Sequence, residues 1–387
     1  MSMSRRGFLA TASAGVALAL APLPGGGTSV HAQSTGDARR AWAAAPDARQ
    51  DPDPRLRALA YAILAPNPHN LQPWLIELVA ADRMTVSCDL ARRLPATDPF
   101  DRQLTIGFGA FLELLRMAAA QDGYAVRMDS FPDGTPGRRL DTRPVAGLRF
   151  EPMPGMASDP LFRHALSRRT NRARYDMARV PDAATIMLLA SAAVPGADVG
   201  TTTAPNLTAA LRDHVWRAFR TEALTHEAHI ESVNVMRMGR AAVIANPDGI
   251  SLDAPELEPL VAQGVLTQAA MASPDSPVFQ QFLALYDGPV RATPAFLWLV
   301  TPGNSRAEQL RAGADWLRLN LQATGLGLAL HPQSATLQEY PEMDGLLREV
   351  HDLLGIHQGR IQMLARLGHG PVVPPAPRWP AATRLKG

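Results

Sequence analysis

The sequence predicts an α+β fold in which two tandem related halves form an intramolecular pseudo-dimer. Short strand-like runs alternate with longer helical patterns over the 387 residues, which favours the α+β class. A partial repeat on two of the helical patterns favours two halves, because each half offers one apolar helix and too few strands to bury it alone. The repeated positions are Gly109, Ala110, Leu115, Ala119 and Gly123, which return 204 residues later as Gly313, Ala314, Leu319, Ala323 and Gly327.

The first half is expected over 50–155, after a polar stretch rich in proline and aspartate. Apolar residues at helical spacing predict helices at 55–64 and 104–121. The second of these ends at Gly123, because glycine readily takes the left-handed conformation of a helix C-terminus. Short runs with β-branched or aromatic residues predict strands at 74–79, 85–90, 124–128 and 147–150.

The second half is expected over 160–387. A short helix is predicted at 160–166, and longer helices follow at 209–231 and 308–324. Ser305 and Glu308 form a capping box before the last of these, since each side chain can satisfy a free amide of the other residue. Strands are predicted at 296–301, 328–330 and 361–367.

An insertion is predicted at 238–293. Prolines and Asn-Pro-Asp-Gly or Ser-Pro-Asp-Ser-Pro turns divide this stretch into short apolar segments, unlike the rest of the chain. Insertions of this size in compact enzymes are often lids over a site. A peripheral group of helices explains the same pattern equally well, so both interpretations stay open.

Composition excludes several classes of function. The 38 basic and 36 acidic residues leave a formal charge of +2, which gives no overall field for binding nucleic acid. Lys386 is the single lysine, so the other 37 basic residues are arginines and any anion is expected to bind arginine. The single cysteine, Cys88, excludes an intramolecular disulfide, a multi-cysteine zinc site and a cysteine-ligated iron–sulfur cluster.

Residues 1–32 have the pattern of a signal peptide. Arg5 and Arg6 precede Phe8-Leu9 and the small apolar run 10–21, and Val30-His31-Ala32 offers a cleavage site. The paired arginines resemble a twin-arginine export signal, which predicts a periplasmic or otherwise exported protein with the twin-arginine translocase as a transient partner. No later segment reaches about 18 uninterrupted apolar residues, so we expect no transmembrane segment in the mature form.

The loop 65–74 is the first candidate binding segment. Three prolines limit its conformations before a predicted strand, and they present Asn70 and Gln72 as hydrogen-bonding side chains. Such amides suit a planar heterocycle with imide-like edges. A proline-rich turn whose amides cap their own backbone is the alternative.

The second candidate segment contains Arg168, Arg169, Thr170 and Arg172. Three arginines and a hydroxyl within five residues can surround a dianionic phosphate with charge-assisted hydrogen bonds. The alternative is a solvated helix end whose basic charge lies near the C-terminal dipole.

These two segments and the C-terminus carry a family resemblance. Residues 67–74, N-P-H-N-L-Q-P-W, resemble the P-S-x-x-N-x-Q-P-W loop of the flavin-dependent nitroreductases, and R-R-T-N-R at 168–172 resembles their R-[RH]-S-x-[RK] phosphate motif. The stretch 354–378 resembles their closing strand and terminal arginine. Here the loop precedes the phosphate motif, whereas in the family it follows it within one domain. Family members are homodimers that bind flavin between subunits, so the chain resembles a fused dimer, similar to the exported Acg-like branch.

The resemblance implies one FMN between the halves and a second site that has been lost. Arg168, Thr170 and Arg378, with Arg169 beside them, would hold the phosphate, and Arg172 would lie near the pyrimidine edge. The loop would cover the ring from the other half, and the segment after the second repeated helix would approach flavin N5 with its backbone. The residues implied in these two segments are Pro66, Asn67, Pro68, Asn70 and Gln72, and Pro332, Gln333 and Ser334.

The resulting expectation is an FMN-dependent oxidoreductase that reduces nitro-aromatic, quinone or similar electron-poor acceptors. The flavin carries the chemistry, so no catalytic side chain is expected; the partners are a small-molecule electron donor and acceptor, and the architecture is a pseudo-dimeric monomer. The alternative is a non-enzymatic, exported protein that binds or sequesters FMN. A rival zinc site at His214, His226 and His229 lacks the zincin spacing, and no metal is expected.

Overall fold

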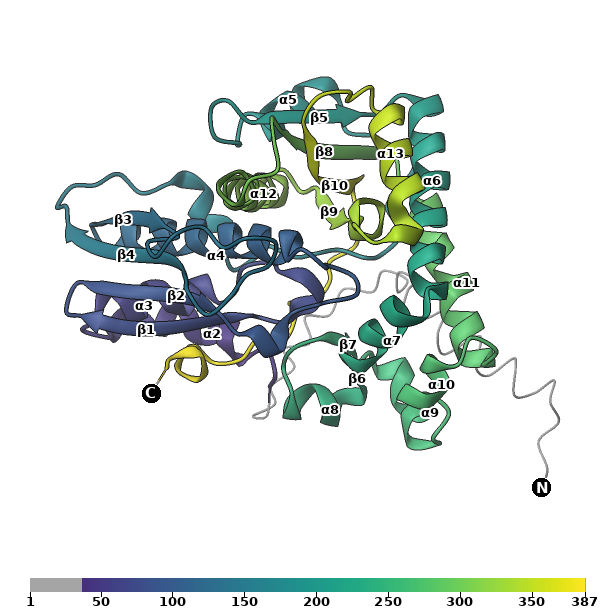
Figure 1. The fold of residues 1–387 in the computed structure, drawn as a ribbon, viewed down its shortest axis with the longest axis horizontal. Helices are drawn as coiled ribbons and strands as arrows, with labels where there is room; N and C mark the ends of the chain where they lie inside the picture. Colours follow the sequence, from purple (N-terminus) through teal and green to yellow (C-terminus); the bar gives the residue numbers. More distant parts are fainter. Residues whose placement is uncertain (1–36, 387) are drawn as a thin grey trace.

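The computed structural model describes residues 37–386, so the expected signal peptide at 1–32 lies outside the described residues. Within them the chain is α+β, as expected, with two antiparallel four-stranded sheets and one small two-stranded sheet (Figure 1). No helix in this range is long and apolar enough to span a bilayer.

The first sheet has the strand order β1-β2-β4-β3. Its helix α4 follows β2 in the chain and packs its aromatic residues against β1, where Phe111 stacks on Trp74 with a centroid distance of 4.7 Å. The elements are α2 (Arg40–Asp47), α3 (Pro54–Ala62), β1 (Trp74–Ala80), β2 (Arg83–Cys88), α4 (Arg102–Gln121), β3 (Tyr124–Ser130) and β4 (Pro144–Pro152).

The second sheet repeats this arrangement with the order β5-β8-β10-β9. Its helix α12 again lies in the chain between the second and third strands of its sheet, and all neighbouring strands are again antiparallel. Both α4 and α12 have 20 residues. The elements are α5 (Ala183–Ala190), β5 (Asp198–Thr202), β8 (Ala295–Thr301), α12 (Arg306–Gly325), β9 (Ala329–Pro332), α13 (Asp344–Leu353) and β10 (Arg360–Gly368).

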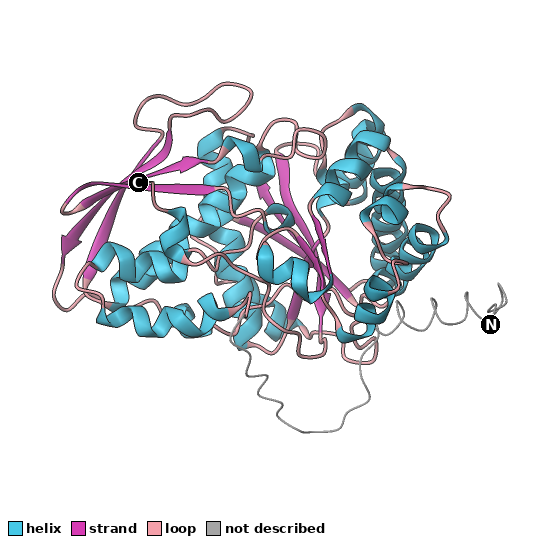
Figure 2. Cartoon of the chain, turned by 90° about the horizontal axis from the view of Figure 1, so that it is seen from below, coloured by secondary structure: helices cyan, strands magenta, loops and turns pink. Residues whose placement is uncertain are grey.

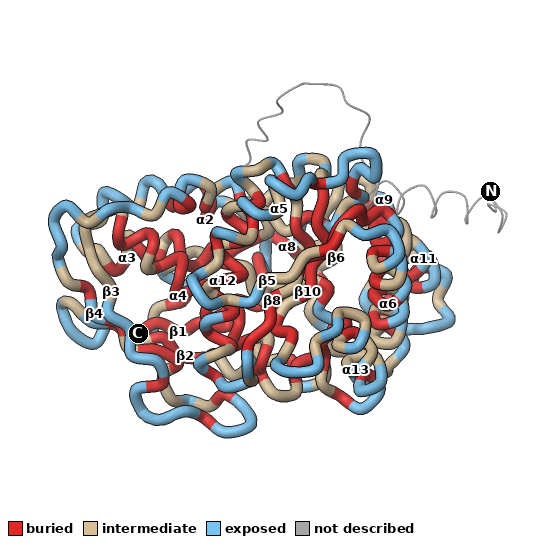
Figure 3. Tube along the Cα trace, turned by 90° about the horizontal axis from the view of Figure 1, so that it is seen from above, coloured by how far each residue is buried: buried red, intermediate tan, exposed pale blue. Residues whose placement is uncertain are grey.

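Gly109 and Gly313 lie where α4 and α12 cross. Both helices are largely buried (Figure 3). A Cβ atom on Gly109 would be 2.0 Å from the carbonyl oxygen of Leu310, and one on Gly313 would be 2.0 Å from that of Ile106. The contacts are reciprocal, because Leu310 and Ile106 are also 204 residues apart. The sequence repeat therefore has a steric cause: two backbones can approach this closely only at glycine.

We expect Gly109→Ala to destabilise the fold by about 1–3 kcal/mol, although alanine is the better helix former. The added methyl group meets backbone, which cannot turn away as a side chain can. Gly345→Ala in α13 is the control, since nothing lies within 4 Å of its Cβ position and we expect a gain of about 0.5–1 kcal/mol. Urea denaturation measures both; a Gly109→Ala variant as stable as wild type would contradict the close crossing.

A mainly helical region fills the chain between β5 and β8, and Figure 2 shows a group of helices at the end of the molecule opposite the first sheet. The expected helix at 209–231 is wrong in one respect, because the chain leaves helical geometry at Thr225 and continues as a second helix. The expected insertion 238–293 covers the later part of this region. The elements are α6 (Pro205–Leu224), α7 (His226–Asn234), β6 (Met236–Met238), α8 (Gly239–Ala245), β7 (Ile250–Leu252), α9 (Glu258–Ala262), α10 (Gln268–Ala272) and α11 (Pro277–Arg291).

All seven expected strands are present, with ends shifted by at most three residues. The capping box of Ser305 and Glu308 is confirmed. The expected helix at 160–166 is a 3₁₀ turn over Pro160–His164 instead. Helix α2 and strand β5 were not expected, since α2 contains a proline and β5 is rich in polar residues.

The last residues of the chain return to the first half. The amide of Lys386 donates to the carbonyl of Ile76 in β1 over 2.7 Å, and Leu385 forms a parallel bridge with the same residue. The C-terminal segment that carries Arg378 thus runs from the second sheet across to the first.

Candidate functional site

Three arginines from the two predicted phosphate segments meet around one indole ring. The guanidinium carbons of Arg169, Arg378 and Arg168 lie 4.9, 5.6 and 5.8 Å from the centroid of Trp42 in α2. Arg168 and Arg378 are each 3% exposed. The sequence separates them by 210 residues, and the fold brings them together.

Within the part of the chain that the structure describes, no carboxylate balances this charge. The three arginines form no ion pair with any residue of 37–386, and they donate mainly to backbone carbonyls, such as those of Ile63 and Leu64 at 2.9 and 3.3 Å. The Nη1 atom of Arg168 is buried without a hydrogen-bond partner. Burial and the neighbouring Arg169 lower the pKa of Arg168 to about 10. Unpaired buried cations are costly, so the cluster has the charge and the free donor that a phosphate group would satisfy.

The 66–72 loop is joined to this cluster through Asn70. Its side chain donates to the carbonyl of Pro377 over 3.0 Å and accepts from Nη1 of Arg378, so both amide atoms are engaged. Asn67 accepts from the amide of Gln72 over 2.8 Å, which is the self-capping contact of a proline-rich turn. His69, Asn70 and Gln72 have positive φ angles of 43°, 56° and 53°, and such strain in non-glycine residues is typical of functional loops.

The Asn-Pro-Asp-Gly turn before β7, which contains Asp248, fastens the helical region to the same loop, since the amide of Gly249 donates to the carbonyl of Asn70 over 3.2 Å. The buried carboxylate of Asp248 accepts from Arg92 and Arg237 at 2.7 Å and from the indole of Trp379 at 2.8 Å. Gln72, which is fully buried, donates to the carbonyl of Pro247 over 2.8 Å and accepts from the amide of Trp379 over 2.9 Å. Three separate segments are therefore locked together beside Arg378.

Arg172 lies near a second group of polar rings. It presents exposed surface and forms no hydrogen bond with the described residues, and burial of its guanidinium lowers its pKa. Burial and Arg172 lower the pKa of His69 to about 4, and burial keeps the pKa of His331 low and those of Tyr175 and Tyr286 high. At neutral pH the rings around this cation are thus uncharged.

The remaining predicted positions lie after β9. Pro332 pairs with Ala365 in the second sheet, and the buried amide of Gln333 donates to the ring of His331 over 3.1 Å. Ser334 is exposed, and Thr170 is half-buried.

Sequence reasoning missed Trp42, His69, Tyr286 and Asp248. Trp42 directly follows Arg40 and Ala41, and Asp248 lies in a turn motif, but neither pattern indicates what the side chain contacts. In the rival zinc site the ring of His229 lies 2.7 Å from the carbonyl of Met271, and His214 is buried with its Nδ1 atom 3.6 Å from Oε1 of Glu349.

Glu222 in α6 is an acidic residue whose pKa lies near neutrality. Burial raises its pKa to about 7, and Glu231 adds to this effect. Its Oε1 atom lies 3.5 Å from the hydroxyl of Ser232, while Oε1 of Gln338 is buried without a partner. A protonated Glu222 can donate a hydrogen bond where a carboxylate cannot.

We expect the stability of the protein to fall as the pH rises from about 4.5 to 8 through the titration of Glu222. A carboxyl whose pKa is raised by folding contributes stability that is complete below its unfolded pKa and is lost as pH rises through the folded value. Glu222→Gln removes this loss, so the variant should match wild type at pH 4 and exceed it by about 1–3 kcal/mol at pH 8. Thermal unfolding across pH measures the difference. Glu349→Gln is the control, because Arg217 lowers the pKa of that carboxyl.

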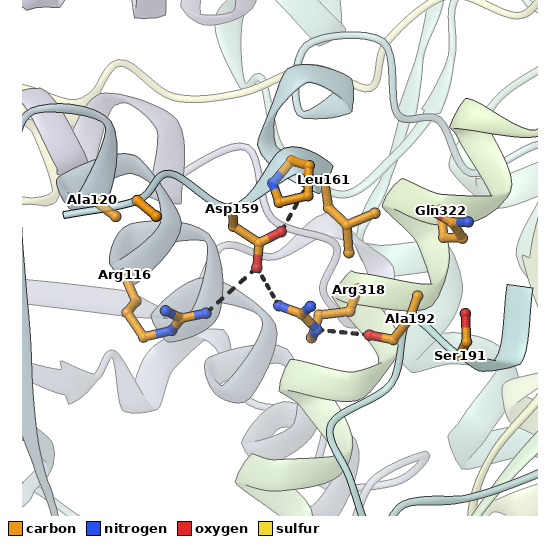
Figure 4. A pocket seen from close by; sticks show the side chains of 10 residues that line it. Arg116, Ala120, Asp159, Leu161, Ser191, Ala192, Arg318 and Gln322 are labelled. Atoms are coloured by element: carbon orange, nitrogen blue, oxygen red, sulfur yellow. Dashed lines mark hydrogen bonds and ion pairs between the residues drawn. The ribbon is translucent and has the colours of Figure 1, made fainter. Parts of the chain in front are cut away.

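A hollow of about 370 Å³ lies at the junction of α4 and α12 (Figure 4), and Trp42 is not among the residues that line it. It also contains arginines, but here they are balanced. Arg318 contacts Asp159 at 2.6 Å and Glu113 at 3.0 Å, and Arg116 contacts Glu113 at 2.7 Å. This hollow therefore lacks the uncompensated charge of the Trp42 cluster.

Comparison with known proteins finds similar sequences and structures. No family model matches the chain. The chain is 27% identical over 329 residues to a protein of Mycobacterium tuberculosis named "Putative NAD(P)H nitroreductase", found in two strains, and the match spans 83% of this chain and 87% of the relative. The two proteins are distant homologues.

Solved structures resemble the chain weakly. The FMN-dependent nitroreductase NfnB of Mycobacterium smegmatis, in complex with NADPH, is 18% identical with a TM-score of 0.32, over 54% of this chain and 86% of that one. A nitroreductase-like family protein of Bacillus cereus is 13% identical with a TM-score of 0.31, over 59% and 96%.

Proposed function

We propose that this distant homologue of an NAD(P)H nitroreductase is an FMN-dependent oxidoreductase that reduces nitro-aromatic, quinone or similar electron-poor acceptors. One observation carries the proposal: three arginines from the two segments that resemble the family's phosphate motif and terminal arginine meet around Trp42. Among residues 37–386 they have no carboxylate partner, and the buried Nη1 atom of Arg168 has no hydrogen-bond partner. The homologous relative supports the same class of reaction.

The residues that would hold FMN fall into two groups. Arg168, Arg169 and Arg378 would bind the phosphate, because a dianion neutralises their charge and satisfies the free donor. Arg172 would face the pyrimidine edge, where a cation stabilises negative charge on the ring. Bound FMN would supply hydride or electron transfer. The protein would position it and exclude competing anions, and no side-chain acid or base is required.

The matching strand orders and the reciprocal glycine contacts support two related halves that form a pseudo-dimer with one flavin site. The balanced arginines between α4 and α12 favour a single anion site. We also propose, from the sequence of residues 1–32, that the protein is exported by the twin-arginine route, as in the Acg-like branch.

The second candidate is a non-enzymatic FMN-binding protein. The contacts of Asp248 and Gln72 favour it, because they fasten the helical region to the 66–72 loop and would hinder large acceptors. Under the lid interpretation, cutting these contacts should increase acceptor access.

Anaerobic mixing of the FMN-loaded protein with NADH or NADPH tests the choice. Bleaching of the flavin absorbance, followed by reoxidation with a nitro-aromatic or quinone, is expected for the oxidoreductase. An exported reductase would need an electron donor other than NADH or NADPH. A strong chemical reductant therefore serves as the positive control for flavin that can be reduced. Flavin that this reductant bleaches, but that no nicotinamide or quinol donor reduces, would leave the binding protein as the function.

A further inference from the structure

We propose that Trp42 is a positioning residue that assembles Arg168, Arg169 and Arg378 into one preformed site for a phosphate monoester. The proposal rests on the proposed function, in which that monoester belongs to FMN. It assigns a role to α2, a helix outside every motif that carries the family resemblance.

The first observation is the placement of the indole ring. Trp42 is 7% exposed, and three guanidinium groups approach it to between 4.9 and 5.8 Å. The face of an indole attracts cations through its quadrupole, and more strongly where water is excluded. Among the described residues no carboxylate offers these arginines an alternative partner.

The second observation is the way in which Trp42 is held. Its indole Nε1 donates to the carbonyl of Ala376 over 2.8 Å, and the amide of Arg378 donates to the carbonyl of Ala38 over 2.8 Å. Arg39 adds a bond to the carbonyl of Pro375 at 2.7 Å. Helix α2 is therefore docked on the segment that carries Arg378, while its indole also reaches Arg168 and Arg169. One ring joins the two segments.

These observations indicate preorganisation. Three like charges repel one another: burial lowers the pKa of Arg378, and the charges of Arg168 and Arg169 lower it further. Without the ring the side chains would spread into other rotamers, and binding would then have to reorder them. The indole ring of Trp42 should thus increase the affinity for ligands that carry a phosphate and leave the affinity for ligands without one unchanged.

The test compares Trp42→Leu, Trp42→Phe and the control Trp298→Leu, which removes an indole from β8 in the second sheet. Apo-protein is titrated with FMN, riboflavin and inorganic phosphate by calorimetry. For Trp42→Leu we expect FMN affinity to fall at least tenfold and phosphate binding to weaken, with riboflavin affinity within twofold of wild type. Trp42→Phe keeps an aromatic face and should retain FMN affinity within about threefold; Trp298→Leu should change neither ligand.

A spectroscopic readout in the wild type covers the case in which Trp42→Leu does not fold. The chain has six tryptophans. With 5-fluorotryptophan incorporated, inorganic phosphate should shift the ¹⁹F resonance of Trp42, assigned with Trp42→Phe, and leave that of Trp298 unchanged. An unshifted Trp42 signal at saturating phosphate, or unchanged FMN affinity in Trp42→Leu, would overturn the inference.

Failure of the proposed function gives a different result. Wild-type protein that binds inorganic phosphate through Trp42 but does not bind FMN would contradict the flavoprotein and leave the anion site in place. Equal loss of FMN and riboflavin affinity in Trp42→Leu would instead indicate general damage to the fold and refute the phosphate-specific role.

Discussion

Replacing Arg168 with alanine is expected to weaken FMN binding by roughly 10- to 150-fold. The guanidinium is buried, has no carboxylate partner in the described range 37–386, and has one nitrogen without a hydrogen-bond partner there that could donate to a phosphate oxygen. A charge-assisted hydrogen bond of this kind contributes about 1.5–3 kcal/mol, which gives that range. Riboflavin lacks the phosphate and should bind the wild type poorly, with little response to the substitution. Titration of apo-protein with both flavins measures the effect.

Arg163→Ala is the matched control, because Arg163 is exposed in the 3₁₀ turn just before this segment and donates a hydrogen bond to the ring of His164 over 3.0 Å. It should change FMN affinity by a few tenths of a kcal/mol at most. Equal FMN affinity in wild type and Arg168→Ala would remove the phosphate role from this motif and favour a solvated basic turn.

Asn70→Ala should reduce FMN affinity more than riboflavin affinity. From the sequence alone the amide is expected to touch the ring, which would affect both flavins equally. In the structure the side chain of Asn70 accepts a hydrogen bond from Arg378 and donates one to the carbonyl of Pro377. Its loss should therefore leave Arg378, a proposed phosphate-binding residue, less firmly positioned. Equal losses for the two flavins would restore the ring contact as its main role.

Asp248→Ala is expected to destabilise the protein by about 3–5 kcal/mol. The carboxylate accepts from Arg92, Arg237 and Trp379, and its removal leaves two half-buried guanidinium groups and an indole without their acceptor. Breaking one side of a buried ion pair costs more than the pair contributes, because the remaining charge stays desolvated. Urea denaturation measures the change, and Asp141→Ala, which removes an exposed partner of Arg143, should cost at most about 1 kcal/mol.

Asp248→Asn separates charge from shape. Burial by itself raises the pKa of Asp248, but hydrogen bonds from Trp379, Arg92 and Arg237 outweigh it and lower the pKa. A carboxyl with a lowered pKa stabilises the fold above its unfolded value near 4, and this contribution is lost as the pH falls through the folded value. The advantage of wild type over Asp248→Asn should therefore be full at pH 7 and shrink below about pH 4. A difference that does not change with pH would contradict the ionic role.

The sequence by itself determined seven strands of the two four-stranded sheets and the long helices α4 and α12, but it did not predict helices α2, α5 and α13. Strand and helix patterns depend on residues within a few positions, so β1, α4 and the capping box at Ser305 could be read from local spacing. The repeat of Gly109 at Gly313 also predicted two helices of equal register. Local reasoning failed at Thr225, where the chain leaves helical geometry without a proline or glycine to mark the break.

The sequence also determined which residue types could bind an anion, since a chain with one lysine must use arginine. It left open whether 168–172 was a binding segment or a solvated turn, and the tertiary structure decides what each arginine contacts. Burial, the distance to Trp42, and the absence of a carboxylate among the described residues all depend on segments more than 100 residues apart. The desolvation and the electrostatic environment of a side chain depend on all the residues that pack around it. A local sequence pattern does not contain this information. The same reason explains why Asp248 was read as part of a turn and is found holding three segments together.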